Sequence, residues 1–145
     1  MRTGAPGPPG RGDAMRIMII DDHEISRAAF RALLRSQGAD VVADHRACAH
    51  ALAAASALRP EVVLVDVTPE ADTGLSIARK LRGLPTPPIV ILTSSADPAH
   101  FGAKINGYRF IAKADISTAV IASLASTRDQ AGPNPDTPAK RSPPP

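Results

Sequence analysis

Three short runs of apolar residues constrain the fold of this chain more than any other feature of its sequence. Residues 17–20, 62–65 and 89–92 contain only Ile, Val, Leu and Met, with no polar residue at alternate positions. A strand with one face in water alternates apolar and polar side chains, whereas a strand covered on both faces is apolar throughout. The runs therefore predict central strands of a parallel sheet with helices on both faces.

The remaining segments give an alternating order of strands and helices. Two further short runs, at 41–43 and 109–112, bring the number of predicted strands to five. A helix is predicted after each of them, at residues 24–37, 48–57, 75–83, 98–105 and 115–127. Five strands that each precede a helix predict an α/β fold with a doubly wound parallel sheet.

The first predicted helix has a clear apolar periodicity. Helical spacing places six residues on one face, namely Ile25, Ala28, Ala29, Phe30, Leu33 and Leu34. Gly38 is a natural stop signal for this helix. We therefore expect this face to pack against the sheet.

Proline and glycine divide the chain into a folded part and two tails. Of the 15 prolines, three lie in residues 1–14 and six lie after residue 130. Such segments bury too little apolar surface to offset the entropy lost on ordering. We predict disordered tails at 1–14 and 129–145 around one folded domain at 15–128. Met15 opens the segment that contains the first predicted strand, so Met1 and Met15 are both candidate start residues.

Charge and composition exclude several classes of protein. Residues 15–127 carry 12 Lys and Arg against 11 Asp and Glu, a net charge of +1 out of the total of +3, so no basic face for DNA is predicted. A single cysteine, Cys48, excludes an internal disulfide framework and a zinc site built from several thiolates. No apolar run approaches the roughly 18 residues that span a bilayer, and no signal peptide is recognisable. We expect a cytoplasmic protein without membrane or direct nucleic-acid contacts.

Residues that can carry chemistry follow the predicted strands. They are Asp21 and Asp22 after the first strand, Asp66 after the third, Thr93 and Ser94 after the fourth, and Lys113 after the fifth. The carboxyl ends of parallel strands meet at one edge of a sheet, where ligands bind. Crowded carboxylates repel one another without a cation, and oxygen ligands favour Mg²⁺. A lysine and a hydroxyl nearby suit an anion, so the set is typical of phosphoryl transfer to a carboxylate.

Over residues 15–127 the sequence resembles the receiver domain of two-component response regulators. Five spaced elements carry the resemblance: Ile-Ile-Asp-Asp-His at 19–23, Val-Val-Leu-Val-Asp at 62–66, Gly-Leu at 74–75, Ile-Leu-Thr-Ser at 91–94 and Phe-Ile-Ala-Lys at 110–113. The resemblance implies a flavodoxin-like sheet with strand order 2-1-3-4-5. The Asp-Asp-His opening, with Arg27 four residues on, is most similar to regulators that carry a C-terminal helix-turn-helix, which the sequence after residue 128 does not predict.

Carried over residue by residue, the resemblance implies a phosphoacceptor and a metal site. Asp66 would accept the phosphoryl group. Asp22, Asp66 and the backbone carbonyl of Thr68 would bind Mg²⁺ directly, and Asp21 would assist, partly through water. The four histidines show no spacing typical of a metal site, so we expect structural or solvent roles for them, although His23 stands beside the acidic pair.

The resemblance also implies a switch. Thr93 would bind the phosphoryl group, Lys113 would pair with it, and Phe110 would be the rotating aromatic residue, with a plain core role as its alternative. The phosphoryl donor would be a histidine kinase. The output would be binding of another protein or a second copy through the face built from segment 98–105, strand 109–112 and helix 115–127.

Four features depart from the usual receiver pattern. Pro69 lies three residues after Asp66, and Glu70 occupies the next position, where the family usually has Pro. The segment from 93 to 113 is slightly short, and Arg109 replaces a small residue. Ala114 follows the lysine, so no cis peptide bond is expected there. We predict a reshaped loop after Asp66 and a short or irregular helix at 98–105.

Two classes of function remain open at this point. The first is a stand-alone phosphorylation switch that catalyses at most its own phosphorylation and dephosphorylation. The alternative is a receiver-like interaction module without phosphate regulation, or the receiver fragment of a truncated transcription regulator. A metabolic enzyme is disfavoured, because Asp66-Val67-Thr68 lacks the second carboxylate of phosphatases with an Asp-x-Asp motif, and the chain has no nucleotide-binding glycine loop.

Overall fold

The computed structural model describes residues 14–127, which form one five-stranded parallel sheet. The strands are β1 (Arg16–Ile20), β2 (Asp40–His45), β3 (Val62–Asp66), β4 (Ile89–Ser94) and β5 (Arg109–Ala112). Their order in the sheet is β2-β1-β3-β4-β5, and every neighbouring pair is parallel. The predicted sheet and its strand order 2-1-3-4-5 are confirmed. The predictions for the two tails, and for the start residue Met1, fall outside the described residues.

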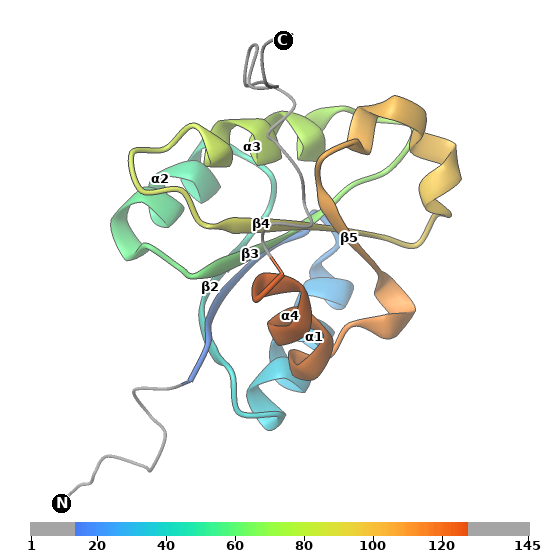
Figure 1. The fold of residues 1–145 in the computed structure, drawn as a ribbon. Helices are drawn as coiled ribbons and strands as arrows, with labels where there is room; N and C mark the ends of the chain where they lie inside the picture. Colours follow the sequence, from blue (N-terminus) through green and yellow to red (C-terminus); the bar gives the residue numbers. More distant parts are fainter. Residues whose placement is uncertain (1–13, 128–145) are drawn as a thin grey trace, which may run out of the picture.

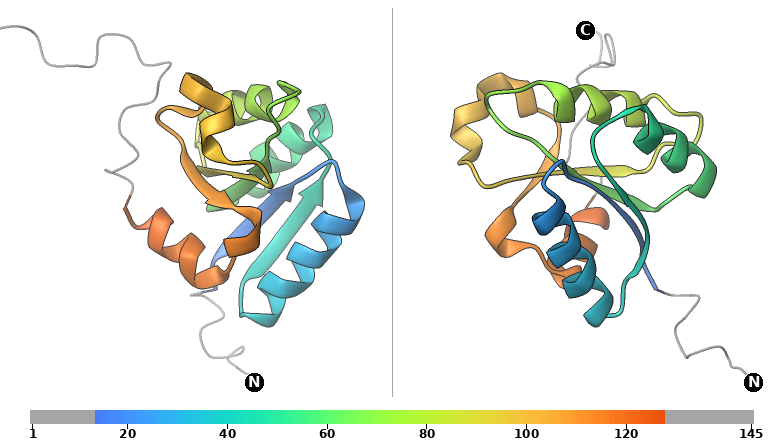
Figure 2. Two further views of the ribbon diagram at one scale, coloured as in Figure 1. Left: turned by 90° about the vertical axis from the view of Figure 1, so that its right-hand side faces the viewer. Right: turned by 180° about the vertical axis from the view of Figure 1, so that it is seen from behind.

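Helices cover both faces of this sheet, as Figures 1 and 2 show. They are α1 (Glu24–Ser36), α2 (Ala49–Leu58), α3 (Thr73–Arg82), the 3-10 segments η2 (Pro98–Ile105) and η3 (Lys113–Asp115), and α4 (Thr118–Ala125). The segments α2, α3 and η2 pack on one face, and α1 and α4 pack on the other. The doubly wound arrangement follows from this division.

Strand side chains alternate between two apolar layers, and neither side of the central strands reaches water. One layer, under α2 and α3, includes Met18, Val63, Val65, Val90 and Leu92. The other, under α1 and α4, includes Ile17, Ile19, Val62, Leu64, Ile91 and Ile111. Burial on both faces explains why the central strands are apolar without alternation.

Two strands extend beyond their apolar runs. β2 continues to His45, and β4 continues through Thr93 to Ser94, whereas runs 41–43 and 89–92 predicted shorter strands. In β4 the polar residues stay in register, because Thr93 pairs with Asp66 on β3 and Ser94 pairs with Ala112 on β5. Backbone hydrogen bonding therefore carries the sheet into the polar segment where the candidate site lies.

The prediction for the inward face of α1 was wrong in part. Leu34 is fully buried, but Ile25 is 86% exposed and Leu33 is 37% exposed. Instead, Arg27 Nε and Arg31 Nη1 donate to the two carboxylate oxygens of Asp44 on β2, at 3.0 and 2.8 Å. In this orientation the arginines of α1 lie against β2, and part of its apolar stripe faces solvent.

The structure confirms the expected irregular segment at 98–105. η2 begins with a cap in which Asp97 Oδ1 accepts from the Ala99 N–H at 2.8 Å, and it is broken at Gly102, which has φ 59° and ψ −137°. The prediction of a helix from residue 115 was wrong, because α4 begins at Thr118, where Ser117 Oγ accepts from the Val120 N–H. None of the helices between residues 14 and 127 has the length and apolar character to cross a lipid bilayer.

Replacing Asp44 by Asn is expected to lower the free energy of unfolding by about 1–2 kcal/mol at neutral pH, because two guanidinium groups lose their charged acceptor. Burial raises the pKa of Asp44, but the hydrogen bonds and charges of Arg31 and Arg27 outweigh it and hold the pKa below its ordinary value of 3.8. The stabilisation is therefore complete above the unfolded-state pKa and is lost as pH falls through the folded-state pKa. Urea unfolding should show the two proteins converging in acid; a pH-independent difference would contradict the ion pairs.

Candidate functional site

Three charged side chains meet at the carboxyl edge of the sheet. Asp21 directly follows β1, Asp66 is the last residue of β3, and Lys113 directly follows β5. Lys113 Nζ lies 3.0 Å from Asp21 Oδ2 and 3.0 Å from Asp66 Oδ1. The exposed fractions of the three side chains are 2%, 8% and 12%, in that order. The structure thus brings together residues that are 45 to 92 positions apart in the chain.

This cluster is short of positive charge. Burial raises the pKa of Asp66, and the neighbouring Asp21 carboxylate raises it as well. The hydrogen bond from Lys113 lowers the pKa but does not outweigh these effects, so the pKa of Asp66 lies above its ordinary value. Burial lowers the pKa of Lys113, but its hydrogen bonds to Asp66 and Asp21 outweigh that effect and raise the pKa. One ammonium group therefore faces two buried carboxylates, and a further cation would relieve the remaining repulsion.

Thr93 lies beside Asp66 on the neighbouring strand. The two residues are register partners in β3 and β4, and the Val67 N–H donates to the Thr93 carbonyl oxygen at 2.8 Å. Thr93 is 3% exposed. The next residue, Ser94, accepts from the Ala96 N–H through its Oγ at 3.0 Å, so its hydroxyl shapes the following loop.

Gly74 lets the first turn of α3 approach the end of β3. A Cβ at this position would overlap the backbone carbonyl oxygen of Asp66 and lie 3.0 Å from Val67 Cγ1. No side chain fits between the helix and the strand end. The glycine of the Gly-Leu element is therefore needed to place α3 directly beside Asp66.

Asp22 lies apart from the other two carboxylates. Its Oδ1 accepts from the Ala47 N–H at 2.7 Å, which ties it to the loop between β2 and α2. It lines an open groove that includes Arg27, Asp44 and His45. In this structure Asp22 therefore anchors a neighbouring loop, and its predicted role as a direct metal ligand stays a prediction.

The loop after Asp66 contains a turn from Thr68 to Ala71. The Ala71 N–H donates to the Thr68 carbonyl oxygen at 3.4 Å, a long hydrogen bond, with Pro69 and Glu70 at the tip. The fixed φ of proline suits the second position of such a turn. Pro69 at its unusual position thus shapes the loop that presents the Thr68 carbonyl, whose role as a metal ligand also stays a prediction.

His23 joins the cluster, although sequence reasoning expected no more than a structural or solvent role for it. Its Nδ1 lies 3.3 Å from Asp21 Oδ1 and 3.8 Å from Asp66 Oδ2. One ligand atom from each of Asp21, His23 and Asp66 lies within 4.8 Å of the others. The available signal was its position directly after the acidic pair.

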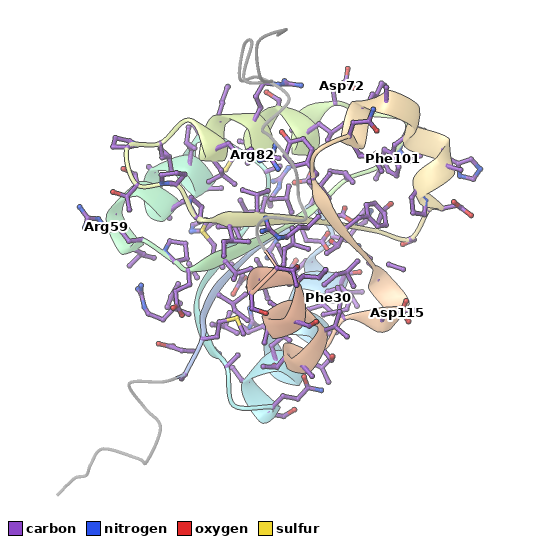
Figure 3. All side chains as sticks on the ribbon, in the orientation of Figure 1. Phe30, Arg59, Asp72, Arg82, Phe101 and Asp115 are labelled. Atoms are coloured by element: carbon purple, nitrogen blue, oxygen red, sulfur yellow. The ribbon has the colours of Figure 1, made fainter. Side chains whose placement is uncertain are left out.

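Phe110 is half-buried on β5 and packs against the core layer under α3. Its ring lies 6.1 Å from that of Phe101, centroid to centroid, with an angle of 59° between the planes. Phe101, labelled in Figure 3, is 4% exposed and lies on η2. The predicted switch residue therefore links β5 to the irregular segment η2.

The donor set fits a divalent cation. The oxygens Asp21 Oδ1 and Asp66 Oδ2 are the ones that do not contact Lys113, and both belong to buried carboxylates. Hard cations such as Mg²⁺ prefer such oxygens. Asp21 Oδ1 also accepts the His23 N–H at 2.8 Å. Net negative charge and two buried carboxylates together support a metal at this edge of the sheet.

Two transcription regulators are similar to this chain in sequence. The activator EvgA of Escherichia coli K12, described as a DNA-binding transcriptional activator, is 27% identical over 120 residues, which are 79% of this chain and 58% of EvgA. The transcriptional regulatory protein LiaR of Bacillus subtilis is 32% identical over 85 residues, which are 57% of this chain and 40% of LiaR. The chain thus spans between two fifths and three fifths of the length of these relatives.

Solved structures of receiver domains share the fold. The receiver domain of the putative response regulator NarL from Mycobacterium tuberculosis superimposes with a TM-score of 0.63 at 29% identity, covering 79% of this chain and 98% of that domain. A CheY-like receiver domain from Methylobacillus flagellatus gives the same TM-score at 22% identity, with the same two coverages. The family model of the response regulator receiver domain matches residues 17–124. That match includes β2 to β5, all of β1 except Arg16, and the edge where Asp21, Asp66 and Lys113 meet, so this chain belongs to the response regulator receiver domain family.

Proposed function

We propose that this domain is a phosphorylation switch in which Asp66 accepts a phosphoryl group from a histidine kinase with the help of Mg²⁺. One observation carries the proposal, namely the surroundings of Asp66 at the end of β3. Asp66 Oδ1 lies 3.0 Å from Lys113 Nζ, and Thr93 is the register partner of Asp66 on β4. A nucleophilic carboxylate, a cation and a hydroxyl are the groups that phosphoryl transfer needs in one place.

Each of these residues has a separate task in the transfer. A carboxylate oxygen of Asp66 forms a bond to phosphorus as the bond from phosphorus to the kinase imidazole nitrogen breaks, which gives an acyl phosphate and a free histidine. The Lys113 ammonium offsets charge on the phosphoryl oxygens, and the Thr93 hydroxyl donates a hydrogen bond to one of them. Gly74 keeps α3 close to the strand end, so Asp66 stays in position.

Asp21, Asp22, Asp66 and the Thr68 carbonyl are the groups that would hold Mg²⁺. The bound ion supplies positive charge that offsets the negative charge of the phosphoryl oxygens during transfer. Asp22 Oδ1 accepts from the Ala47 N–H, so Oδ2 is the oxygen that Asp22 would offer to the metal. Asp21 and Asp66 already turn one oxygen each away from Lys113.

Two surfaces suit the partners of such a switch. Next to the site, the exposed residues Ile25, Ala29 and Leu33 lie along α1, where a kinase would approach Asp66. On the opposite edge, β5 lies between η2 and α4 (Figure 2, left) and carries Phe110. We assign the output surface to η2, β5 and α4. A new charge at Asp66 would draw Thr93 and Lys113 inward, and this movement would change the space beside Phe110 on β5.

Intact mass spectrometry tests the proposal. After incubation with Mg²⁺ and acetyl phosphate, the protein is expected to gain about 80 Da, the mass of one phosphoryl group, and to lose this gain with EDTA. Asp66→Ala should abolish the gain, whereas Asp72→Ala, which removes a carboxylate that is 82% exposed, should retain it. The position of Asp72 is labelled in Figure 3.

The absence of any gain in folded wild-type protein would contradict the switch. That outcome would favour an interaction module without phosphate regulation, for which the irregular segment η2 and the turn at Pro69 are the supporting features.

A further inference from the structure

Arg27 on α1 joins the end of β1 to β2 through two hydrogen bonds. Its Nη1 donates to the main-chain carbonyl oxygen of Asp21 at 2.7 Å, and its Nε donates to Asp44 Oδ1 at 3.0 Å. The side chain is 16% exposed, so solvent competes little for these bonds. A guanidinium group is planar and keeps its donors in a fixed geometry. Arg27 therefore sets the position of the Asp21 carbonyl relative to a carboxylate on β2.

The main chain of Asp21 is held through both of its polar groups. Its N–H donates to the His45 carbonyl oxygen at 2.9 Å, which continues the pairing of β1 with β2 beyond Ile20. Its carbonyl oxygen is the atom that accepts from Arg27. Its carboxylate oxygen Oδ2 lies 3.0 Å from Lys113 Nζ. Because the main chain decides the direction in which a side chain leaves it, the two main-chain bonds aim the Asp21 carboxylate at Lys113.

Arg31 shares the ion pair with Asp44 but not the contact with Asp21. Its Nη1 donates to the other oxygen of Asp44, Oδ2, at 2.8 Å. Within residues 14–127, the side chain that donates to the Asp21 carbonyl is that of Arg27. Loss of either arginine would therefore weaken the attachment of α1 to β2, whereas only loss of Arg27 would release the Asp21 main chain.

We propose that Arg27 is a positioning residue for phosphoryl transfer, which holds the Asp21 main chain so that the Asp21 carboxylate faces Lys113 and the edge where Asp66 lies. This inference rests on the proposed function, since Asp21 acts there together with Asp66. Without the guanidinium, the peptide group after Asp21 loses a hydrogen-bond donor in a buried place and is free to rotate, and the carboxylate turns with it.

A positioning role and a simple charge effect have opposite signs. Removing a cation near acidic residues raises their affinity for another cation, because one repulsion is lost. Loss of positioning instead lowers the affinity for Mg²⁺, because Asp21 no longer faces the site. Arg27→Met and Arg31→Met remove the same charge from the same helix, so a comparison of the two separates these effects.

Carbon NMR of the metal-free full chain, labelled with ¹³C and ¹⁵N, tests the contact itself. A donated hydrogen bond deshields a carbonyl carbon, so Arg27→Met should move the Asp21 carbonyl resonance to a lower chemical shift. Arg31→Met should leave that resonance in place. Asp44 keeps one arginine in each variant, so urea unfolding should show similar losses of stability for both.

The initial rate of phosphoryl gain from acetyl phosphate, measured by intact mass over a series of Mg²⁺ concentrations, tests the role in transfer. In Arg27→Met the Mg²⁺ concentration that gives half of the maximal rate should rise at least about tenfold, the lower end of the range for residues that support metal ligands. In Arg31→Met it should not rise. Arg27→Lys restores the charge without the rigid pair of donors, so its Mg²⁺ dependence should stay impaired.

The outcomes separate this inference from the proposed function. The same Mg²⁺ dependence in Arg27→Met and Arg31→Met, or full recovery in Arg27→Lys, would overturn the positioning role and leave transfer to Asp66 standing. If folded wild type gains no phosphoryl group at any Mg²⁺ concentration, both proposals fail. Circular dichroism checks the fold of each variant. If Arg27→Met is unfolded, Arg27→Lys, which keeps a cation near Asp44, is compared with Arg31→Met in its place.

Discussion

Replacing Lys113 by Met is expected to lower the free energy of unfolding of the metal-free protein by about 3 kcal/mol, because removing one partner of a buried ion pair leaves uncompensated charge. Among the described residues, the ammonium group of Lys113 contacts both Asp21 and Asp66, each at 3.0 Å. Excess Mg²⁺ should restore part of the loss, because an ion bound at the same carboxylates of the folded state would supply positive charge there. Urea unfolding with EDTA or Mg²⁺ measures both effects.

The pH dependence of the Lys113→Met variant follows from the same charges. The hydrogen bond from Lys113 lowers the pKa of Asp66, so its removal leaves burial and Asp21 to raise that pKa further. A carboxyl with a raised folded-state pKa stabilises the fold below its unfolded-state pKa and loses that effect as pH rises through the folded-state pKa. The variant should therefore approach wild type in acid and fall furthest below it at alkaline pH.

Lys104→Met is the matched control. Lys104 is 56% exposed and pairs with the exposed Asp72 at 3.5 Å, so its loss should cost less than about 1 kcal/mol and should not depend on Mg²⁺. Equal urea midpoints for Lys113→Met and wild type in EDTA would show that the buried carboxylates do not need the ammonium.

Replacing Gly74 by Ala is expected to destabilise the domain by about 3 kcal/mol, the upper part of the range for overpacked sites. The new Cβ would overlap the Asp66 carbonyl oxygen and approach Val67 Cγ1, both of them held by the sheet and core. Because the backbone of β3 cannot move without losing hydrogen bonds to its neighbours, α3 must shift away from the strand end. The gain of a phosphoryl group from acetyl phosphate should fall in parallel, since α3 would no longer pack against the strand end that presents Asp66.

Gly83→Ala controls for the general effect of a methyl group in this region. A Cβ at Gly83 would lie 3.5 Å from the Lys80 carbonyl oxygen, an ordinary contact, so little change in stability is expected. Both variants can be compared by urea unfolding and by intact mass. If Gly74→Ala were as stable as Gly83→Ala, the close packing of α3 on the end of β3 would be wrong.

The meeting of Asp21, Asp66 and Lys113 could be predicted because it depends on topology alone. Each follows an apolar run, and parallel strands bring the residues after such runs to one edge. The orientation of Asp22 and His23 could not be predicted in this way. Both lie in the turn between β1 and α1, where the Ala47 N–H attracts one side chain and the paired carboxylates attract the other. Those partners lie on other elements of the fold.

The same reason explains the errors in the helices. Apolar spacing in α1 predicted Ile25 and Leu33 as inward residues, but Asp44 on β2 binds Arg27 and Arg31 and turns the helix. The spacing of apolar residues within 24–37 gives no information about a hydrogen-bond acceptor on a neighbouring strand. The irregular η2, by contrast, was predictable from a shortened segment, and its break at Gly102 uses a positive φ that glycine adopts without strain.

The sequence by itself determined a doubly wound parallel sheet and the residues at its carboxyl edge, because runs buried on both faces permit few other arrangements. The strand order was implied by the resemblance to receiver domains. Only the tertiary structure decided which carboxylate oxygens lie against Lys113, which of them lies near His23, and why Gly74 must lack a side chain. These features depend on distances of a few ångströms between elements that are far apart in the chain. Local patterns specify such elements, but packing sets how their side chains meet.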